Sequence, residues 1–95
     1  MPLLTKKEIA ASLKNVPSWS KRRQIIRRTF TFDDFPPAIT FVNRIARYAQ
    51  KLNHHPDIDI RFNKVTLAVT SHDAGGLTQK DFVLAGKCDG AFLKA

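Results

Sequence analysis

The chain has 95 residues, 43% of them hydrophobic, which suffices for one domain spanning residues 1–95 and excludes a second. Sixteen Lys and Arg against eight Asp and Glu give a formal net charge of +8, which makes nucleic acid or an anionic ligand a possible partner. No zinc-finger, RNA-binding or glycine-rich phosphate motif accompanies this charge, so we expect mostly solvated surface and do not expect nucleic-acid binding. We find no signal peptide and no apolar run of about 18 residues, and therefore expect a cytoplasmic protein with no membrane association. The lone Cys88 excludes an intramolecular disulfide and is expected to be buried.

The first third of the chain predicts a helix followed by two strands. Thr5 and Glu8 have the spacing of a capping box, so a helix should begin there and end in the segment 15–18. From Gln24 to Phe32 the polarity alternates with a period of two, which indicates a strand with Arg27, Thr29 and Thr31 on its polar face. Residues 19–21 should form a short partner strand, with the turn at 21–23.

A long helix is predicted to follow the Phe35-Pro36-Pro37 segment, because prolines are tolerated in a first helical turn. Apolar residues recur there at three- and four-residue spacing: Ala38, Phe41, Val42, Ile45, Ala49 and Leu52. Pro56 requires the helix to end by about His54 or His55, since the residue before a proline avoids the helical region. The adjacent histidines should therefore lie at a helix C-terminus.

The next segments, 57–62 and 65–70, alternate in polarity and predict a β-hairpin. With Asn63-Lys64 as its two-residue turn, Ile60 would face Leu67, and all the apolar residues of the hairpin would share one face. The same register would place His55 opposite His72. Thr78 and Asp81 have the spacing of a second capping box, which should open a last helix with Phe82, Ala85, Cys88 and Phe92 turned inward.

The element order α-β-β-α-β-β-α predicts an α+β domain in which a four-stranded antiparallel sheet has three helices packed on one face. Such a sheet has exposed edges. Because exposed edges are often covered by a second copy of the chain, we expect a homo-oligomer, either a dimer or a tetramer.

The histidines are the clearest chemical signal, because His54, His55 and His72 all fall within nineteen residues and are expected to converge. Imidazole has an ordinary pKa of about 6.5 and can act as an acid or a base near neutral pH. No nucleophile elbow or oxyanion-hole glycine run accompanies them. The cluster therefore favours proton transfer over covalent catalysis. A metal site with Asp73 as an additional ligand is a weaker alternative, because adjacent histidines rarely point the same way.

The segment Asn53-His54-His55-Pro56, followed at fixed spacing by Phe62, His72 and Asp81, resembles the signature of the pterin-4a-carbinolamine dehydratases. The resemblance extends to Asn63-Lys64-Val65, Thr70-Ser71-His72-Asp73 and Leu77-Thr78, and includes Trp19 and the Phe30-x-Phe32 pair. It implies dehydration of 4a-hydroxytetrahydropterin to the quinonoid dihydropterin, as part of tetrahydrobiopterin recycling. It also implies no metal and no organic cofactor.

Three catalytic residues, His54, His55 and His72, follow from this resemblance, with Asp73, Gln50 and Trp19 as residues that bind substrate or orient a histidine. Asp81 is expected chiefly to cap the last helix. The family usually has a charged or ionisable residue four positions before the first histidine, where this chain has Gln50; we expect its amide to bond His54 across one helical turn. Two alternatives stay open: a non-catalytic dimerisation module that co-regulates transcription, because animal members of the family act in this way, and a basic nucleic-acid-binding protein.

Overall fold

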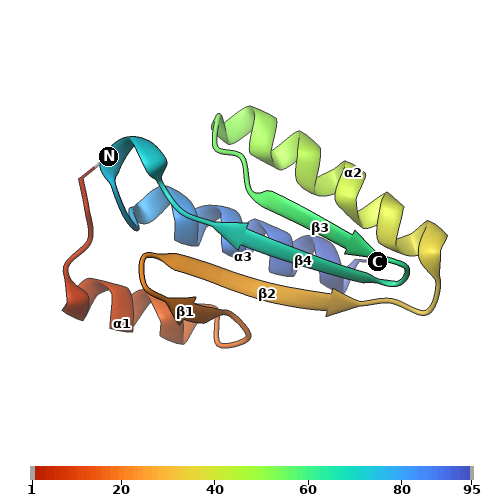
Figure 1. Cartoon of the computed structure of the whole chain (residues 1–95), viewed down its shortest axis with the longest axis horizontal. Helices are drawn as coiled ribbons and strands as arrows, with labels where there is room; N and C mark the ends of the chain where they lie inside the picture. Colours follow the sequence, from red (N-terminus) through yellow and green to blue (C-terminus); the bar gives the residue numbers. More distant parts are fainter. Residues whose placement is uncertain (1, 95) are drawn as a thin grey trace.

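The computed structural model describes residues 2–94, and its elements follow the predicted α-β-β-α-β-β-α order (Figure 1). These elements are α1 (Lys6–Asn15), β1 (Ser20–Arg22), β2 (Ile25–Thr31), α2 (Phe35–Leu52), β3 (Asp57–Arg61), β4 (Lys64–Val69), the 3-10 turn η1 (His72–Ala74) and α3 (Gln79–Leu93). The α+β prediction with a four-stranded antiparallel sheet is thereby confirmed. Within residues 2–94, no helix is both long enough and apolar enough to cross a bilayer.

The sheet has the strand order β1-β2-β4-β3, and all three pairings are antiparallel (Figure 1). One face of β2 and β4 is apolar and joins the helices in a single core cluster. This cluster includes Ile26, Phe30, Val65, Leu67 and Val69 from the strands, with Ile9 from α1, Phe41 and Ile45 from α2, and Phe82, Leu84 and Cys88 from α3. The opposite face of β2 carries the exposed Arg27, Thr29 and Thr31, as the alternation predicted.

Both capping boxes mark true helix starts. Thr5 accepts the Glu8 backbone N–H at 3.1 Å, and the Glu8 carboxylate accepts the Thr5 N–H at 2.8 Å. Thr78 is the N-cap of α3, where the Asp81 carboxylate accepts its N–H at 2.8 Å. These reciprocal bonds satisfy amides that have no acceptor inside their own helix.

The predicted register of the β3–β4 hairpin is wrong by two residues. Arg61 pairs with Lys64, so the turn is Phe62-Asn63, and Ile60 faces Val65 instead of Leu67. The cause is Asn63, which is held by the end of β2: its backbone oxygen accepts the Phe32 N–H at 2.9 Å, and its side-chain amide donates to the Phe32 carbonyl at 2.8 Å. A two-residue shift preserves the alternation, so the apolar residues still share one face.

The β1–β2 turn also differs from the prediction, because Arg22 pairs with Ile25 and the turn is Arg23-Gln24, with Arg23 in the left-handed region at φ 57°. At the other edge of the sheet, every residue of β3 is exposed. Ile58 and Ile60 are 39% and 38% accessible, and Phe62 in the adjoining turn is 65% accessible. An apolar edge strand thus lies uncovered in the single chain.

Candidate active site

The first part of the site is the end of α2. Asn53 ends the helix in the left-handed conformation, at φ 51°, and the His54 backbone N–H bonds back to the Ala49 carbonyl at 3.0 Å. Asparagine tolerates this conformation better than most residues, and such a cap satisfies the last carbonyls of a helix. The chain then leaves the helix axis in extended form toward Pro56, and therefore places His54 and His55 beside the last turn instead of on it.

The second part is the loop that connects β4 to α3. Ser71 and Gly76 form an isolated antiparallel bridge, and η1 is folded between them. Gln24 of the β1–β2 turn supports this loop from outside: its side-chain oxygen accepts the Leu77 N–H at 3.0 Å, and its backbone oxygen accepts the Thr70 hydroxyl at 2.6 Å. The loop that carries His72 is thus closed by the Ser71–Gly76 bridge and hydrogen-bonded to the β1–β2 turn.

The third part is Asp81, in the first turn of α3, whose side chain is fully buried. One carboxylate oxygen accepts the Ser71 hydroxyl at 2.9 Å and the Thr78 N–H at 2.8 Å; the other lies 2.6 Å from His54 Nε2. A buried carboxylate is tolerated only when its oxygens are bonded, and a charge-assisted bond to imidazole is a strong one. Asp81 therefore joins the end of α2, the loop after β4 and the start of α3.

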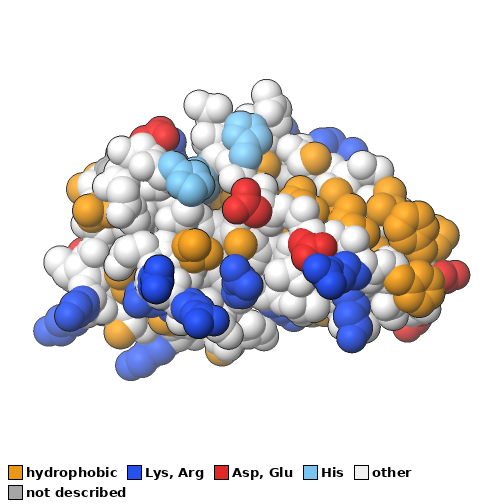
Figure 2. Space-filling model, in the orientation of Figure 1, with side chains coloured by type: hydrophobic (Ala, Val, Ile, Leu, Met, Phe, Trp, Pro, Cys, Tyr) orange, Lys and Arg blue, Asp and Glu red, His pale blue; other side chains and the backbone are white. Residues whose placement is uncertain are grey.

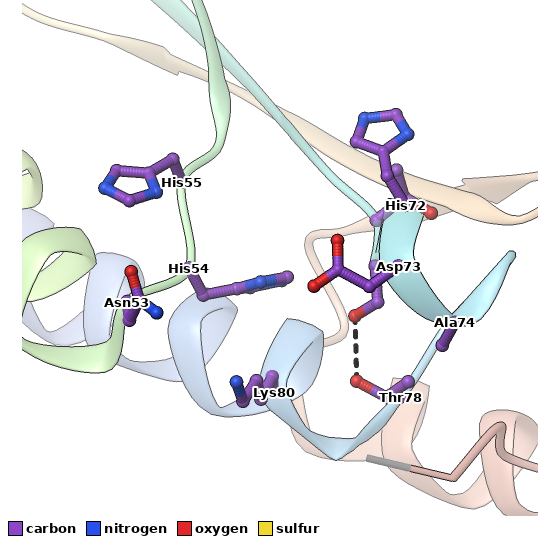
Figure 3. Close-up of a pocket in the computed structure, with 10 residues that line it drawn as sticks. Asn53, His54, His55, His72, Asp73, Ala74, Thr78 and Lys80 are labelled. Atoms are coloured by element: carbon purple, nitrogen blue, oxygen red, sulfur yellow. Dashed lines mark hydrogen bonds between the residues drawn. The ribbon is translucent and has the colours of Figure 1, made fainter.

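These parts enclose an open cavity of about 380 Å³, a size that fits a small ligand. It is lined by Asn53, His54, His55, Thr70, Ser71, His72, Asp73, Ala74, Thr78 and Lys80. Figure 3 shows the His54 ring extending from the end of α2 toward Asp73, while the His55 and His72 rings project away from each other. The His54 side chain is 12% accessible, whereas His55 and His72 are exposed.

The structure brings most of the predicted site residues together. His54, His55, His72 and Asp73 line one cavity, as expected, although the reason given for the meeting of His55 and His72 was wrong. In the observed register the strand position opposite residue 55 is Thr70, and His72 reaches the same cavity two residues later, from η1. A histidine-rich rim is exposed at the upper edge of the sheet face in Figure 2, where a dissolved substrate can reach it.

Two predicted residues lie elsewhere or have another partner. Trp19 is a core residue, 4% accessible, whose indole N–H donates to the Asp89 carboxylate at 2.8 Å; it does not line the cavity. Gln50 bonds His55 Nε2 at 3.1 Å, and not His54. Residues four apart share a face only within a helix, and Asn53 ends α2 and turns the chain away before His54. The expected Gln50–His54 bond therefore does not form.

Sequence reasoning missed Asn53 and Lys80 as lining residues and underrated Asp81. The Thr78-x-x-Asp81 spacing explains a capping role completely, so nothing local indicated a second partner 27 residues away. Among the residues the structure describes, no three His, Cys, Asp or Glu side chains are grouped so as to hold a metal ion. Three imidazoles, a carboxylate and an ammonium line one open cavity, and imidazoles can transfer protons near neutral pH.

Comparisons with known proteins identify relatives over nearly the whole chain. The family model described as pterin 4 alpha carbinolamine dehydratase matches residues 2–91. A relative from Chloroflexus aurantiacus is 54% identical over 89 residues, which cover 94% of this chain and 96% of the relative. One from a Picosynechococcus species is 55% identical over 86 residues, which cover 90% and 94%. Both are provisionally named pterin-4-alpha-carbinolamine dehydratases.

A crystal structure from Brucella melitensis, described as a transcriptional coactivator/pterin dehydratase, superposes with a TM-score of 0.90. It is 34% identical to this chain, and the match covers 94% of this chain and 97% of the other. The fold, the near-complete coverage and the level of identity lead to one assignment. The chain belongs to the pterin-4-alpha-carbinolamine dehydratase family, whose members are hydro-lyases.

Proposed function

We propose that this protein dehydrates 4a-hydroxytetrahydropterins to quinonoid dihydropterins by histidine acid-base catalysis and so serves the recycling of tetrahydrobiopterin. The observation that carries the proposal is the convergence of His54, His55 and His72 on one cavity, with His54 anchored to the buried Asp81. The reaction needs one proton delivered and one removed, and needs no redox step. Imidazoles supply both transfers near neutral pH.

In the proposed reaction, one imidazolium protonates the C4a hydroxyl as the C4a–O bond breaks and water leaves. A neutral imidazole takes the proton from N5, and the electron pair of the N5–H bond forms the C4a–N5 double bond. His55 and His72 both line the cavity and are the candidates for these two transfers. His54 is held through Nε2 by Asp81, so its Nδ1 is the nitrogen left to accept a hydrogen bond from substrate.

The same cavity offers partners for the pterin ring itself. A pterin presents an amino group and a ring N–H on one edge and a carbonyl oxygen beside them. The Asp73 carboxylate suits the donor edge, and the Lys80 ammonium suits the carbonyl oxygen, and both side chains line the cavity. Asp73 and Lys80 are therefore proposed to set the orientation of the ring between the histidines.

A direct dehydration assay tests the function. The 4a-hydroxy substrate is generated in the cuvette, and formation of the quinonoid product is followed with and without the protein. We expect His55→Ala and His72→Ala to lose roughly 10²- to 10⁴-fold in kcat, the usual contribution of positioned proton transfer. Arg22→Ala, at an exposed strand position outside the cavity, is the control and should keep full activity. No acceleration by the parent protein would refute the proposal.

We also propose that the chain assembles as a homo-oligomer through β3, whose exposed edge carries Ile58 and Ile60. Pairing with a second copy would satisfy the free backbone groups of the edge and cover these side chains. Replacing both with Lys should give monomers in sedimentation, because lysines on an edge strand oppose pairing. Val83→Lys, at an α3 position that is 38% accessible, is the matched control. A parent protein that already sediments as a monomer would contradict the assembly.

The alternative role is that of a transcriptional co-regulator. The description of the Brucella melitensis structure names such a role for that protein. A catalytically dead His55→Ala/His72→Ala variant separates the two roles. Retention of a stable heteromeric complex by that variant, together with an inactive parent protein in the assay above, would favour the co-regulator.

A further inference from the structure

A second cavity, of about 270 Å³, contains none of the histidines and lies between α2 and the end of α3. It is lined by Arg44, Arg47, Tyr48, Lys51 and Lys94, and by no acidic residue. The four α2 residues occupy positions i, i+3, i+4 and i+7 counted from Arg44, so they share one face of the helix. Lys94 comes from the residue after the end of α3. Two elements therefore bring four positive charges to one hollow.

These charges have no partner among the residues that the structure describes. Among residues 2–94, none of the four cationic side chains takes part in an ion pair or a side-chain hydrogen bond. Arg28 shows the contrast: its guanidinium bonds the Asp89 carboxylate at 2.7 Å and lies over the Phe30 ring. Like charges at such helical spacings repel one another, so an anion in the hollow would relieve an unfavourable arrangement.

The cavity contains partly buried side chains as well as exposed lysines. Arg44 and Tyr48 are only partly exposed, and Tyr48 packs against the hydrophobic core, which limits the motion of its ring. The pair gives the hollow a guanidinium fork and a phenol hydroxyl, both suited to phosphate oxygens. Lys51 lies seven residues beyond Arg44, about 10 Å along the helix axis. The charges are thus spread over a length, not gathered at a point.

We propose that this cavity binds a chain of linked phosphate groups carried by a small soluble molecule. The spacing along α2 favours two or three linked phosphates over a single one. The cavity volume of about 270 Å³ is just below the usual range of ligand pockets, roughly 300–1,000 Å³, and therefore suits a small ligand. Duplex nucleic acid fits less well, because it is a rod that needs cations along an open surface. The exposed basic cluster of Lys21, Arg22, Arg23 and Arg27 lies on β1, the β1–β2 turn and β2, and none of its residues lines this cavity.

Calorimetric titration of the full chain with inorganic tripolyphosphate tests the proposal, at an ionic strength of roughly 0.1 M, where the screening length is about 10 Å. We expect saturation at one equivalent per chain. The double variant Arg44→Gln/Arg47→Gln should bind at least about tenfold more weakly, a loss of about 1.4 kcal/mol. The matched control Arg22→Gln/Arg23→Gln removes the same two charges and should bind as the parent does. Lys51→Gln, at an exposed position, should weaken binding too and supports the proposal even if the double variant fails to fold.

Equal weakening by the two double variants would show a response to net charge only and would overturn the proposal. Titration without saturation at one equivalent would do the same. Binding of duplex DNA that is lost in the α2 variant, with no tripolyphosphate binding by the parent, would assign the surface to nucleic acid instead. None of these measurements uses dehydratase activity, so they stand or fall separately from the function proposed for the histidine cavity.

Discussion

Replacing Asp81 with Asn tests whether the buried carboxylate orients His54 for catalysis or only caps α3. Asparagine keeps the size and shape of the side chain. Its carbonyl oxygen can still accept the Ser71 hydroxyl and the Thr78 N–H, but its NH₂ group then faces His54 Nε2, where the carboxylate oxygen lies at 2.6 Å. Two donors cannot face each other, so the His54 proton should move from Nε2 to Nδ1. The nitrogen left free for substrate then becomes a donor instead of an acceptor.

The contacts of Asp81 give the size of the effect. Bonds to a charged group contribute about 1.5–3 kcal/mol and neutral ones about 0.5–1.5 kcal/mol, so exchanging three charged bonds for neutral ones costs about 3–4.5 kcal/mol of unfolding free energy. A domain stable by roughly 5–15 kcal/mol stays folded after such a loss. Asp81→Ala is a poorer test, because it leaves the buried Thr78 N–H without an acceptor. Loss of the correct proton position should lower kcat by about 10²- to 10⁴-fold.

Two measurements are needed: kcat in the dehydration assay, and the tautomer of His54 from the nitrogen chemical shifts of its imidazole. Asp89→Asn is the matched control, since Asp89 also holds two donors, Trp19 and Arg28, but lies outside the histidine cavity. It should lower stability and leave kcat unchanged. A switched tautomer with unchanged kcat would refute the catalytic role of His54, and an unswitched tautomer would refute the orienting role of Asp81.

Three further predictions concern the surroundings of the site and the core. Gln50→Glu places a carboxylate about 3.1 Å from His55 Nε2, which favours the imidazolium form, so the limb of the pH–rate profile that reports His55 should move to higher pH; an unmoved profile would count against this contact. Gly76→Ala should lower stability by roughly 1–3 kcal/mol and speed amide exchange at Leu77, because the new methyl group would lie 2.6 Å from the Gln24 side-chain oxygen that holds that amide. Gly86→Ala, whose added carbon meets no atom within 4 Å, is its helical control and should stabilise by about 0.5–1 kcal/mol; equal effects at both glycines would refute the role of Gln24. Burial, with a smaller contribution from the Asp89 charge, raises the pKa of the Cys88 thiol from 9.0 to about 12. The folded state therefore holds this proton more tightly, so the unfolding free energy should fall by roughly 1 kcal/mol per pH unit as the pH rises from 9 toward 12, and denaturant titrations of Cys88→Ala should lose this slope.

Local signals predicted the elements well, because capping boxes, prolines and alternation act within a few residues of chain. Thr5, Pro56 and Thr78 each mark a helix boundary that the structure has. The turns were harder to place, because a contact distant in sequence decides them. Asn63 was expected in a turn from its residue type, yet its position relative to β4 is fixed by two bonds to Phe32 of another strand. The alternation of polarity along the β3–β4 hairpin does not reveal these bonds to Phe32.

The site was predictable to a similar extent and for the same reason. The histidines were found because their chemistry is carried by residue type. An error of two residues in register did not separate them, because the segment before β3 and the segment after β4 lie at the same end of the hairpin. Trp19 was misplaced because a tryptophan has an apolar ring and one N–H, and these serve the core and the Asp89 bond as well as they would serve a ligand. Its role could not be decided without knowing that Asp89, 70 residues later, lies beside it.

Asp81 explains how so small a domain holds its cavity in shape. The end of α2, the end of β4 and the start of α3 meet at one end of the sheet, and each brings unsatisfied polar groups with it. One buried carboxylate accepts bonds from the last two and contacts the histidine delivered by the first. Its negative charge also lies at the N-terminus of α3, where the helix dipole stabilises it. The group that closes the fold at this end is therefore the group that orients His54, so the position of the imidazole is fixed by the same bonds that hold the three elements together.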